Sequence, residues 1–326
     1  MFENRIRNWQ TLLVGAVVFT LLLSGCCAKE PKVYRVGILS GLDFFVDTAD
    51  GFKDKMTELG YVEGENITYD LQKTNFDPEA EQRILEKFIA DEVDLIVVFP
   101  TEVVLAAKSA TQGTDIPVLF AQAFTEGVDL VESLREPGGN ITGVRYPGPD
   151  LAVKALEILV EVAPQAERVW VPYLQGYPSV PGQLEAMRSA AASLGVTLVE
   201  VPVTSTADLE ADLQARAQSD DLGIDAMMTI YEPVATWPDA AAVITKFAVE
   251  HQLPLGNQSA FRIVVDNVAV GKQAAPLADK ILKGTPAGTI PVVSAEPILK
   301  IEYTAALEQG LTVPEELLHR ADVIER

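Results

Sequence analysis

Three acidic residues of this chain could recognise a charged small molecule. Asp43, Glu102 and Glu232 each follow a run of apolar residues, and such runs are typical of strands buried in a sheet. Carboxylates at strand ends could hold a cationic group such as an α-amino group, provided that hydrogen bonds compensate the loss of water. They could equally be solvated acids at helix starts, where the helix dipole favours negative charge.

Aromatic and polar residues occur in the same predicted loops. The rings could bury a flat or apolar ligand, or they could pack beneath their own loops. Helix starts after Thr101 and Ser179 could receive a carboxylate through free backbone N–H groups. Arg145 and Arg262 could bind a carboxylate or form salt bridges at a hinge. With Asp43, Glu102 and Glu232, the predicted ligand-binding set comprises Phe44, Thr101, Gln122, Phe124, Tyr173, Tyr177, Ser179, Tyr231, Asn257 and Ser259.

Signatures of catalysis are missing from the sequence. It has no Gly-x-Ser-x-Gly, no Gly-x-Gly-x-x-Gly and no P-loop. Only 2 His and 2 Cys are present, so candidates for a general base or a transition-metal site are scarce. The formal net charge of −22 argues against nucleic-acid binding. We therefore expect no catalytic residue, no metal, no cofactor and no nucleic-acid partner.

The N-terminus has the pattern of an export signal. Arg5 and Arg7 precede an apolar run at 11–23, which is shorter than the roughly 20 residues of a membrane span. The run ends in Leu-Ser-Gly-Cys, which resembles the bacterial lipobox and implies lipidation of Cys26. On this interpretation 1–25 is a signal peptide and 26–32 is a tether; the alternative is an uncleaved signal anchor. Because Cys27 is the second and last cysteine, we expect no disulfide in the folded part.

Apolar runs of strand length alternate with helical patterns along the rest of the chain. The run at 94–99 is continuously apolar, as in strands buried on both faces of a parallel sheet. The strand-helix order restarts near residue 151, and Leu59-Gly60 before one buried strand is echoed by Leu194-Gly195 before another. The pattern predicts an α/β fold with two doubly wound, Rossmann-like parallel-sheet lobes.

Strands late in the sequence must return to sheet edges that are already built, so several hinge strands should join the lobes. In such sheets ligands bind outside the carboxyl ends of the strands, where the candidate residues lie. The pattern also predicts a helix at 127–134 and a strand at 263–270. The expected boundaries are 33–142 and 271–292 for lobe 1, 143–270 and 293–326 for lobe 2, and hinges near 140–146, 266–270 and 291–295.

Four segments resemble one known family, the ABC transporter substrate-binding proteins that include tryptophan- and tyrosine-type lipoproteins. The resemblance covers nearly the whole chain after the tether and implies the type I periplasmic binding protein fold. Two loops depart from the pattern, at 123–127 and 175–179, and both are expected to face the ligand. The resembling segments are 137–144 (Pro-Gly-Gly-Asn-Ile-Thr-Gly-Val), 270–284, 289–292 and 305–314.

The resemblance implies an exported, lipid-anchored and monomeric receptor for an ABC permease and its ATPase. It would close its lobes around a small molecule, for which an aromatic or branched apolar amino acid is the leading expectation. The alternatives are a nucleobase-like or other aromatic metabolite as ligand, and a sensor lipoprotein that presents its ligand to a membrane receptor. The expected location is the periplasm or the outer face of the cytoplasmic membrane.

Overall fold

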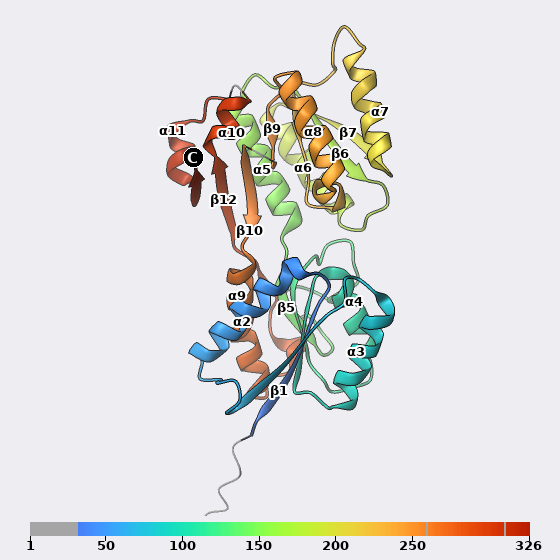
Figure 1. Ribbon diagram of the computed structural model, residues 1–326, viewed down its shortest axis with the longest axis vertical. Coiled ribbons are helices and arrows are strands. Elements are labelled where there is room, and N and C mark those ends of the chain that lie inside the picture. Colours follow the sequence, from blue (N-terminus) through green and yellow to red (C-terminus); the bar gives the residue numbers. More distant parts are fainter. Residues whose placement is uncertain (1–31, 259, 310) are drawn as a thin grey trace, which may run out of the picture.

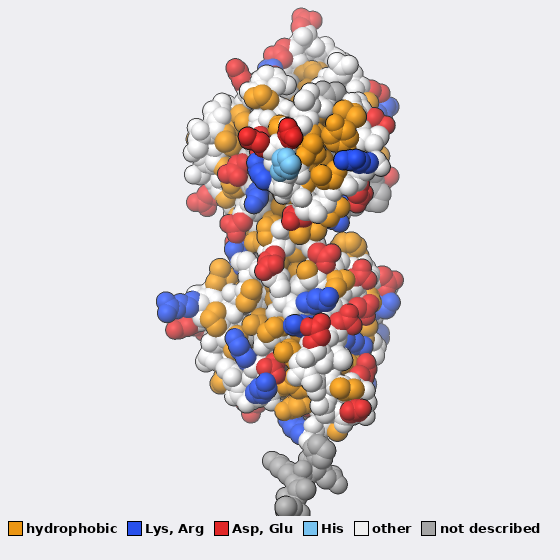
Figure 2. All heavy atoms as spheres, turned by 90° about the vertical axis from the view of Figure 1, so that its left-hand side faces the viewer, with side chains coloured by type: hydrophobic (Ala, Val, Ile, Leu, Met, Phe, Trp, Pro, Cys, Tyr) orange, Lys and Arg blue, Asp and Glu red, His pale blue; other side chains and the backbone are white. Residues whose placement is uncertain are grey.

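Two α/β lobes, one above the other, meet at a narrow waist in the computed structural model (Figures 1 and 2). The structure describes residues 32–258, 260–309 and 311–326. The predicted signal peptide, tether, lipidation site Cys26 and ligand residue Ser259 lie outside this part. Within the part that is described, no helix combines the length and the apolar character needed to cross a membrane.

Lobe 1 is built on a six-stranded parallel sheet with the order β11-β5-β4-β3-β1-β2. Side chains alternate between its faces, so Val97 packs in one hydrophobic layer while Ile96 and Val98 pack in the other. Helices α2 (Val46–Glu58) and α9 (Asn267–Leu282) cover the first face, and α3 (Pro78–Ala90) and α4 (Thr101–Ala110) the second. The strands are β1 (Tyr34–Ser40), β2 (Ile67–Lys73), β3 (Leu95–Phe99), β4 (Val118–Ala123), β5 (Ile141–Arg145) and β11 (Val293–Ser294).

Lobe 2 contains a four-stranded parallel sheet with the order β7-β6-β8-β9. Trp170 is fully buried on one face, and its indole N–H donates to Asp212 at 2.8 Å. The strands are β6 (Arg168–Leu174), β7 (Thr197–Val203), β8 (Ala226–Met228) and β9 (Leu255–Gly256). Two helices pack on each face, namely α5 (Gly148–Val162) with α6 (Val180–Leu194), and α7 (Thr206–Ala217) with α8 (Pro238–Glu250).

A second, small sheet completes lobe 2. In it β12 pairs antiparallel with β10 and parallel with β13. Apolar side chains of β10 and β12 pack in the same core as α5. The remaining elements are β10 (Phe261–Val265), β12 (Pro297–Glu302), β13 (Val323–Glu325), α10 (Tyr303–Glu308), α11 (Glu315–Arg320) and the 3₁₀ turns η1 (Asp43–Phe45), η2 (Pro233–Thr236) and η3 (Ala287–Thr289).

The chain passes between the lobes from β5 to α5, from β10 to α9 and from β11 to β12. Arg145, at the end of β5, ties two of these crossovers together. Its guanidinium donates to Glu126, to Asp150 at 2.7 Å and to the Ser294 hydroxyl at 2.8 Å. The side chain is only 11% exposed, so solvent screens these ion pairs less than surface pairs. Of the two roles considered for Arg145, the geometry supports salt bridging at the hinge.

Several expected element boundaries differ from the structure. The expected lobe boundaries cut β5 and place β11 in lobe 2, whereas both strands belong to the sheet of lobe 1. The predicted strand at 263–270 ends at Val265, because the Asp266 carboxylate accepts from the Ala269 N–H at 2.7 Å and caps α9. The expected hinge at 266–270 is therefore the start of that helix.

The helix expected at 127–134 is absent from the described structure. Gly127 has φ +76°, which a right-handed helix does not allow, and the segment continues as a series of turns. Leu130 is buried in the core of lobe 1, so the apolar pattern reflects packing of a loop.

Helices α2 and α9 cross at two glycines without room for a side chain. A Cβ on Gly271 would lie 2.0 Å from the Thr48 carbonyl oxygen, and one on Gly51 would lie 2.1 Å from the Val268 oxygen. Both obstacles are backbone atoms, so the helices would have to move apart to admit a methyl group. Close packing of α2 on α9 thus depends on glycine at 51 and 271.

We predict that Gly271→Ala lowers the free energy of unfolding by about 1–3 kcal/mol, the usual effect of overpacking. Gly182→Ala is the matched control. Its Cβ would lie 3.5 Å from the nearest atom, and alanine is the better helix former, so stability should be unchanged or slightly higher. Thermal melts of both variants test this, and equal melting temperatures would contradict the packing argument.

Candidate functional site

The two lobes approach each other at what we call the interlobe face. It consists of the loops after β1, β3 and β4 in lobe 1, and the loops after β6 and β8 in lobe 2. Direct contacts join these loops: the Tyr177 hydroxyl of lobe 2 donates to Glu102 of lobe 1 at 3.1 Å. A Cβ on Gly127 would lie 2.0 Å from the Pro178 oxygen, so the backbones also touch. Parallel α/β sheets bind ligands at this end of their strands.

Three aromatic rings form a row through the interlobe face. The ring centroid of Phe124, in lobe 1, lies 5.3 Å from that of Tyr146, in the first crossover. The Tyr146 centroid lies 5.8 Å from that of Tyr231, in lobe 2. The Tyr231 hydroxyl is held 2.6 Å from the Ile263 oxygen and 3.0 Å from the Asn257 amide oxygen. The row therefore has one fixed end in lobe 2, and its half-buried rings offer an apolar surface.

Glu232, the residue after Tyr231, carries a buried carboxyl group. It lies in the loop after β8, and the residue is only 6% exposed. One oxygen accepts from the Leu174 N–H at 3.2 Å, whereas Oε1 has no hydrogen-bond partner among the described residues. Burial raises the pKa of Glu232 to about 7, although backbone N–H groups of Val234 and Leu174 act in the opposite direction. A buried carboxyl oxygen without a hydrogen-bond partner destabilises the folded protein unless another group donates to it.

Thr125 provides the corresponding group on lobe 1. Its hydroxyl is buried and has no partner within the described part of the chain. It directly follows Phe124 in the loop after β4. Each lobe thus contributes one unsatisfied polar atom, from the residue that follows a ring of the aromatic row, and such atoms in native structures call for a partner.

Tyr177 lies near two carboxylates. Burial raises its pKa above the usual range, and the neighbouring Glu102 and Glu232 add to the shift. Its hydroxyl therefore stays protonated and donates to Glu102, which is exposed. The acids Glu102 and Glu232, both predicted ligand residues, are brought to the same face by the structure.

Other predicted ligand residues hold loops in place. Gln122 has φ +56° and donates to Asn267 at 2.5 Å, while the Thr101 hydroxyl accepts from the Phe124 N–H at 3.0 Å. Ser179 is buried and bonded to Gln183, and Asn257 positions Tyr231. These side chains bond to other protein groups and so fix the loops that form the interlobe face.

Two predicted residues lie at its margin. Asp43 has a 77% exposed side chain and pairs with Lys73 at 2.6 Å, and Phe44 is 71% exposed. Tyr173 is half-buried against the core of lobe 2. Arg262 pairs with Glu302 at 3.6 Å within the small sheet, so it is not part of the interlobe face. Tyr146 and Thr125 were missed by sequence reasoning.

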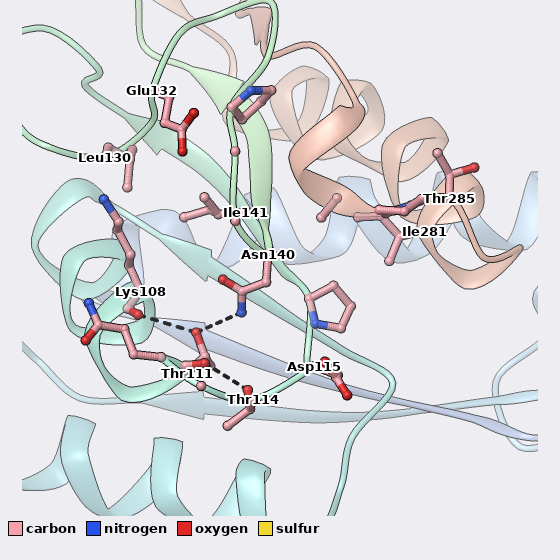
Figure 3. Close-up of a pocket in the computed structure, with 18 of the residues that line it drawn as sticks. Lys108, Thr111, Thr114, Asp115, Leu130, Glu132, Asn140, Ile141, Ile281 and Thr285 are labelled. Carbon is pink, nitrogen blue, oxygen red and sulfur yellow. Dashed lines mark hydrogen bonds between the residues drawn. The ribbon is translucent and has the colours of Figure 1, made fainter.

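A cavity lies at the opposite pole of lobe 1, at the amino ends of β3, β4 and β5 (Figure 3). It measures about 700 Å³, and several of its polar groups are hydrogen-bonded to one another. Asn140 donates to the Thr111 hydroxyl at 3.1 Å and to the Ile116 oxygen at 2.6 Å. The Gly138 N–H donates to the Gly288 oxygen at 3.0 Å. This bond joins the Pro-Gly-Gly-Asn segment, which precedes β5, to η3, which the chain forms after it has returned to lobe 1.

Residues 38–324 match the family described as ABC transporter substrate binding protein. The chain belongs to this family. A curated relative named tyrosine-binding protein, from Clostridioides difficile strain R20291, is 28% identical over 88% of this chain and 87% of its own length. This relationship and the α/β lobes agree with the resemblance drawn from the sequence.

Solved structures share the fold of this substrate binding protein. A ligand-free, open substrate binding protein with adhesive properties from Clostridium difficile superposes with TM-score 0.75, 24% identity, and coverage of 90% of this chain and 99% of its own. A Streptococcus pneumoniae ABC domain in complex with L-Trp gives TM-score 0.73, 22% identity, and coverage of 90% and 100%. The predicted two-lobed, type I periplasmic binding protein architecture is confirmed.

We predict that Glu232→Gln stabilises the ligand-free substrate binding protein at alkaline pH. The folded carboxyl, with pKa about 7 against an ordinary 4.5, holds its proton more tightly than the unfolded one. The wild type therefore loses stability as pH rises from about 4.5 to 7, by about 3 kcal/mol in total, whereas the neutral amide does not. Urea unfolding at pH 5 and pH 8 measures the difference.

Glu157→Gln, at an exposed acid on α5, is the control and should show no such pH-dependent gain. A difference between Glu232→Gln and wild type that is the same at both pH values would contradict the assignment of a protonated Glu232.

Proposed function

We propose that this protein is the extracytoplasmic, lipid-anchored receptor of an ABC importer and that it binds an aromatic or branched apolar amino acid between its lobes. It would pass the ligand to a permease driven by an ATPase and would perform no chemistry itself. Lipidation at Cys26 would hold it at the membrane, and it would act as a monomer. The observation that carries the proposal is the unpartnered, buried oxygen of Glu232, the residue after Tyr231 of the aromatic row.

Glu232 fits the ammonium group of an amino acid. An N–H donor from the ligand would satisfy Oε1, and the opposite charges would compensate each other in a buried site. The Tyr177 hydroxyl and Glu102 complete an acidic corner contributed by both lobes. A ligand without an N–H donor would leave Oε1 without a hydrogen-bond partner.

Neutral hydrogen-bond donors are available for the carboxylate at the other end of the amino acid. The Thr125 hydroxyl has no partner among the described residues, and α4 starts nearby, since Thr101 accepts from the Phe124 N–H. Hydroxyl and helix-start N–H groups are suitable donors to a carboxylate. The side chain of the ligand would then lie against Phe124, Tyr146 and Tyr231. The relative named tyrosine-binding protein supports a ligand of this class.

Closure would follow from contacts made by both lobes. A ligand bound to Glu232 on one lobe and Thr125 on the other makes more contacts when the lobes are close, so it favours the closed arrangement. The three crossovers are the segments that can bend, with Arg145 holding the first and third together. A changed outer surface would signal the bound state to the permease.

We expect L-tyrosine, L-tryptophan, L-phenylalanine or L-leucine to raise the melting temperature of the purified protein. A ligand at 100 times its Kd stabilises by about 2.7 kcal/mol, which corresponds to several degrees. The analogue of the best ligand that lacks the amino group should produce no shift. A shift produced only by nucleobases, or by the desamino analogue as strongly as by the amino acid, would contradict the amino-acid assignment.

Glu232→Gln should weaken amino-acid binding by about 10- to 100-fold, since a hydrogen bond to a charged group contributes about 1.5–3 kcal/mol. Glu157→Gln, on the exposed side of α5, should leave the affinity unchanged. Titration calorimetry measures both variants, and equal affinities for wild type and Glu232→Gln would remove Glu232 from the site.

A further inference from the structure

We propose that the interlobe face exchanges a proton for its ligand: Glu232 is a neutral carboxylic acid in the ligand-free protein and releases its proton to solvent when a ligand ammonium group binds beside Oε1. This inference rests on the proposed function, because it requires a cationic group on the ligand. It adds that binding is coupled to pH through one named residue.

The first step is the position of the carboxyl group. Glu232 is only 6% exposed, and although backbone N–H groups of Leu174, at 3.2 Å, and Val234 act on its carboxyl group, Oε1 has no hydrogen-bond partner among the described residues. An isolated carboxylate in such a place loses its hydration without replacement. The group avoids this penalty by keeping its proton, and the neutral form needs no counter-charge.

The second step is the absence of a counter-charge nearby. Within the described part of the chain, no Lys or Arg forms a salt bridge with Glu232, and burial rather than any charged neighbour is the main cause of its raised pKa. Two arginines of the lobes and crossovers are held by other acids. Arg188 pairs with Glu200 at 2.6 Å, and Arg145 is held by Glu126 and Asp150. A ligand ammonium would therefore be the first cation to reach this carboxyl group.

The third step is the set of titratable groups around it. Tyr177, on the loop after β6, and Tyr231, the preceding residue, are kept neutral because burial raises the pKa of each hydroxyl above its usual range. From lobe 1, Glu102 faces the same corner through its bond with Tyr177 and adds a second acidic group. None of these three neighbours is a cation, so a ligand ammonium would be the group that favours ionisation of Glu232. The raised pKa of about 7 agrees with this geometry.

The exchange balances in charge and atoms. Before binding, the site holds a carboxylic acid and the ligand carries an ammonium group. After binding, carboxylate and ammonium form an ion pair, and one proton has passed from Glu232 to the buffer. No covalent bond of the ligand forms or breaks. Because deprotonation is part of binding, affinity should fall by up to tenfold for each pH unit below about 7 and should level off above it.

The test is titration calorimetry with L-tyrosine, or with L-tryptophan where that gives the larger thermal shift. Binding is measured at pH 6, 7 and 8 in buffers of different ionisation enthalpy, and the slope of observed enthalpy against buffer enthalpy gives the protons released. With a pKa of about 7, about 0.9 proton should be released at pH 6, about 0.5 at pH 7 and about 0.1 at pH 8.

Two variants test whether Glu232 is the residue that releases the proton. In Glu232→Gln the slope should vanish at every pH, whereas Glu157→Gln should retain the wild-type slope. Binding with no proton release at any pH, or release that persists in Glu232→Gln, would overturn the exchange and leave the proposed function standing. Failure of every amino acid to bind would overturn both.

Discussion

The edge of the first sheet imposes the constraint on which the rest of this structure depends. Strand β11 comes late in the chain and pairs with β5, so the chain must leave lobe 1, build lobe 2, and return. This return creates three crossovers and places the carboxyl ends of both sheets on the same face. Arg145 stabilises the arrangement by binding Glu126, Asp150 and Ser294 at the point where two crossovers run side by side.

The interlobe face combines charge and shape in a way that suits a zwitterion with an apolar side chain. Although the chain carries a formal net charge of −22, most of its acids are exposed or paired with lysine or arginine. The carboxyl group of Glu232 differs because burial has removed water without supplying a cation. Ligand binding would correct that imbalance, so recognition of the amino group and release of a proton have the same physical origin. Figure 2 shows acidic and basic side chains interspersed over one face of both lobes, with no large patch of a single sign.

Sequence reasoning predicted the α/β order and the two lobes because these depend on periodic burial, which leaves a clear pattern, and it predicted the family from four short segments that resemble it. It failed where one residue changes the local geometry. Asp266 ends a β-branched run by capping α9, and Gly127 with φ +76° turns a helical pattern into a loop. Asp43 was a strong candidate by position, yet its side chain projects to the margin and pairs with Lys73.

For the candidate site, strand-end position identified Glu232, Tyr231 and Phe124, but it could not distinguish residues that face a ligand from those that support loops. Gln122, Ser179 and Asn257 were selected by position, and the structure engages each in hydrogen bonds within the protein. Tyr146 was overlooked because it lies in a crossover, beyond the end of β5. Its contact with two rings from different lobes is a tertiary feature that no local pattern encodes.

A crystal structure of the protein with L-tyrosine would test the central claim most directly. The account predicts the ligand between the lobes, with its amino nitrogen within about 3.2 Å of Glu232 Oε1 and its ring against Phe124, Tyr146 and Tyr231. A ligand bound in the cavity at the far pole of lobe 1, or between the lobes with its amino group turned away from Glu232, would contradict it.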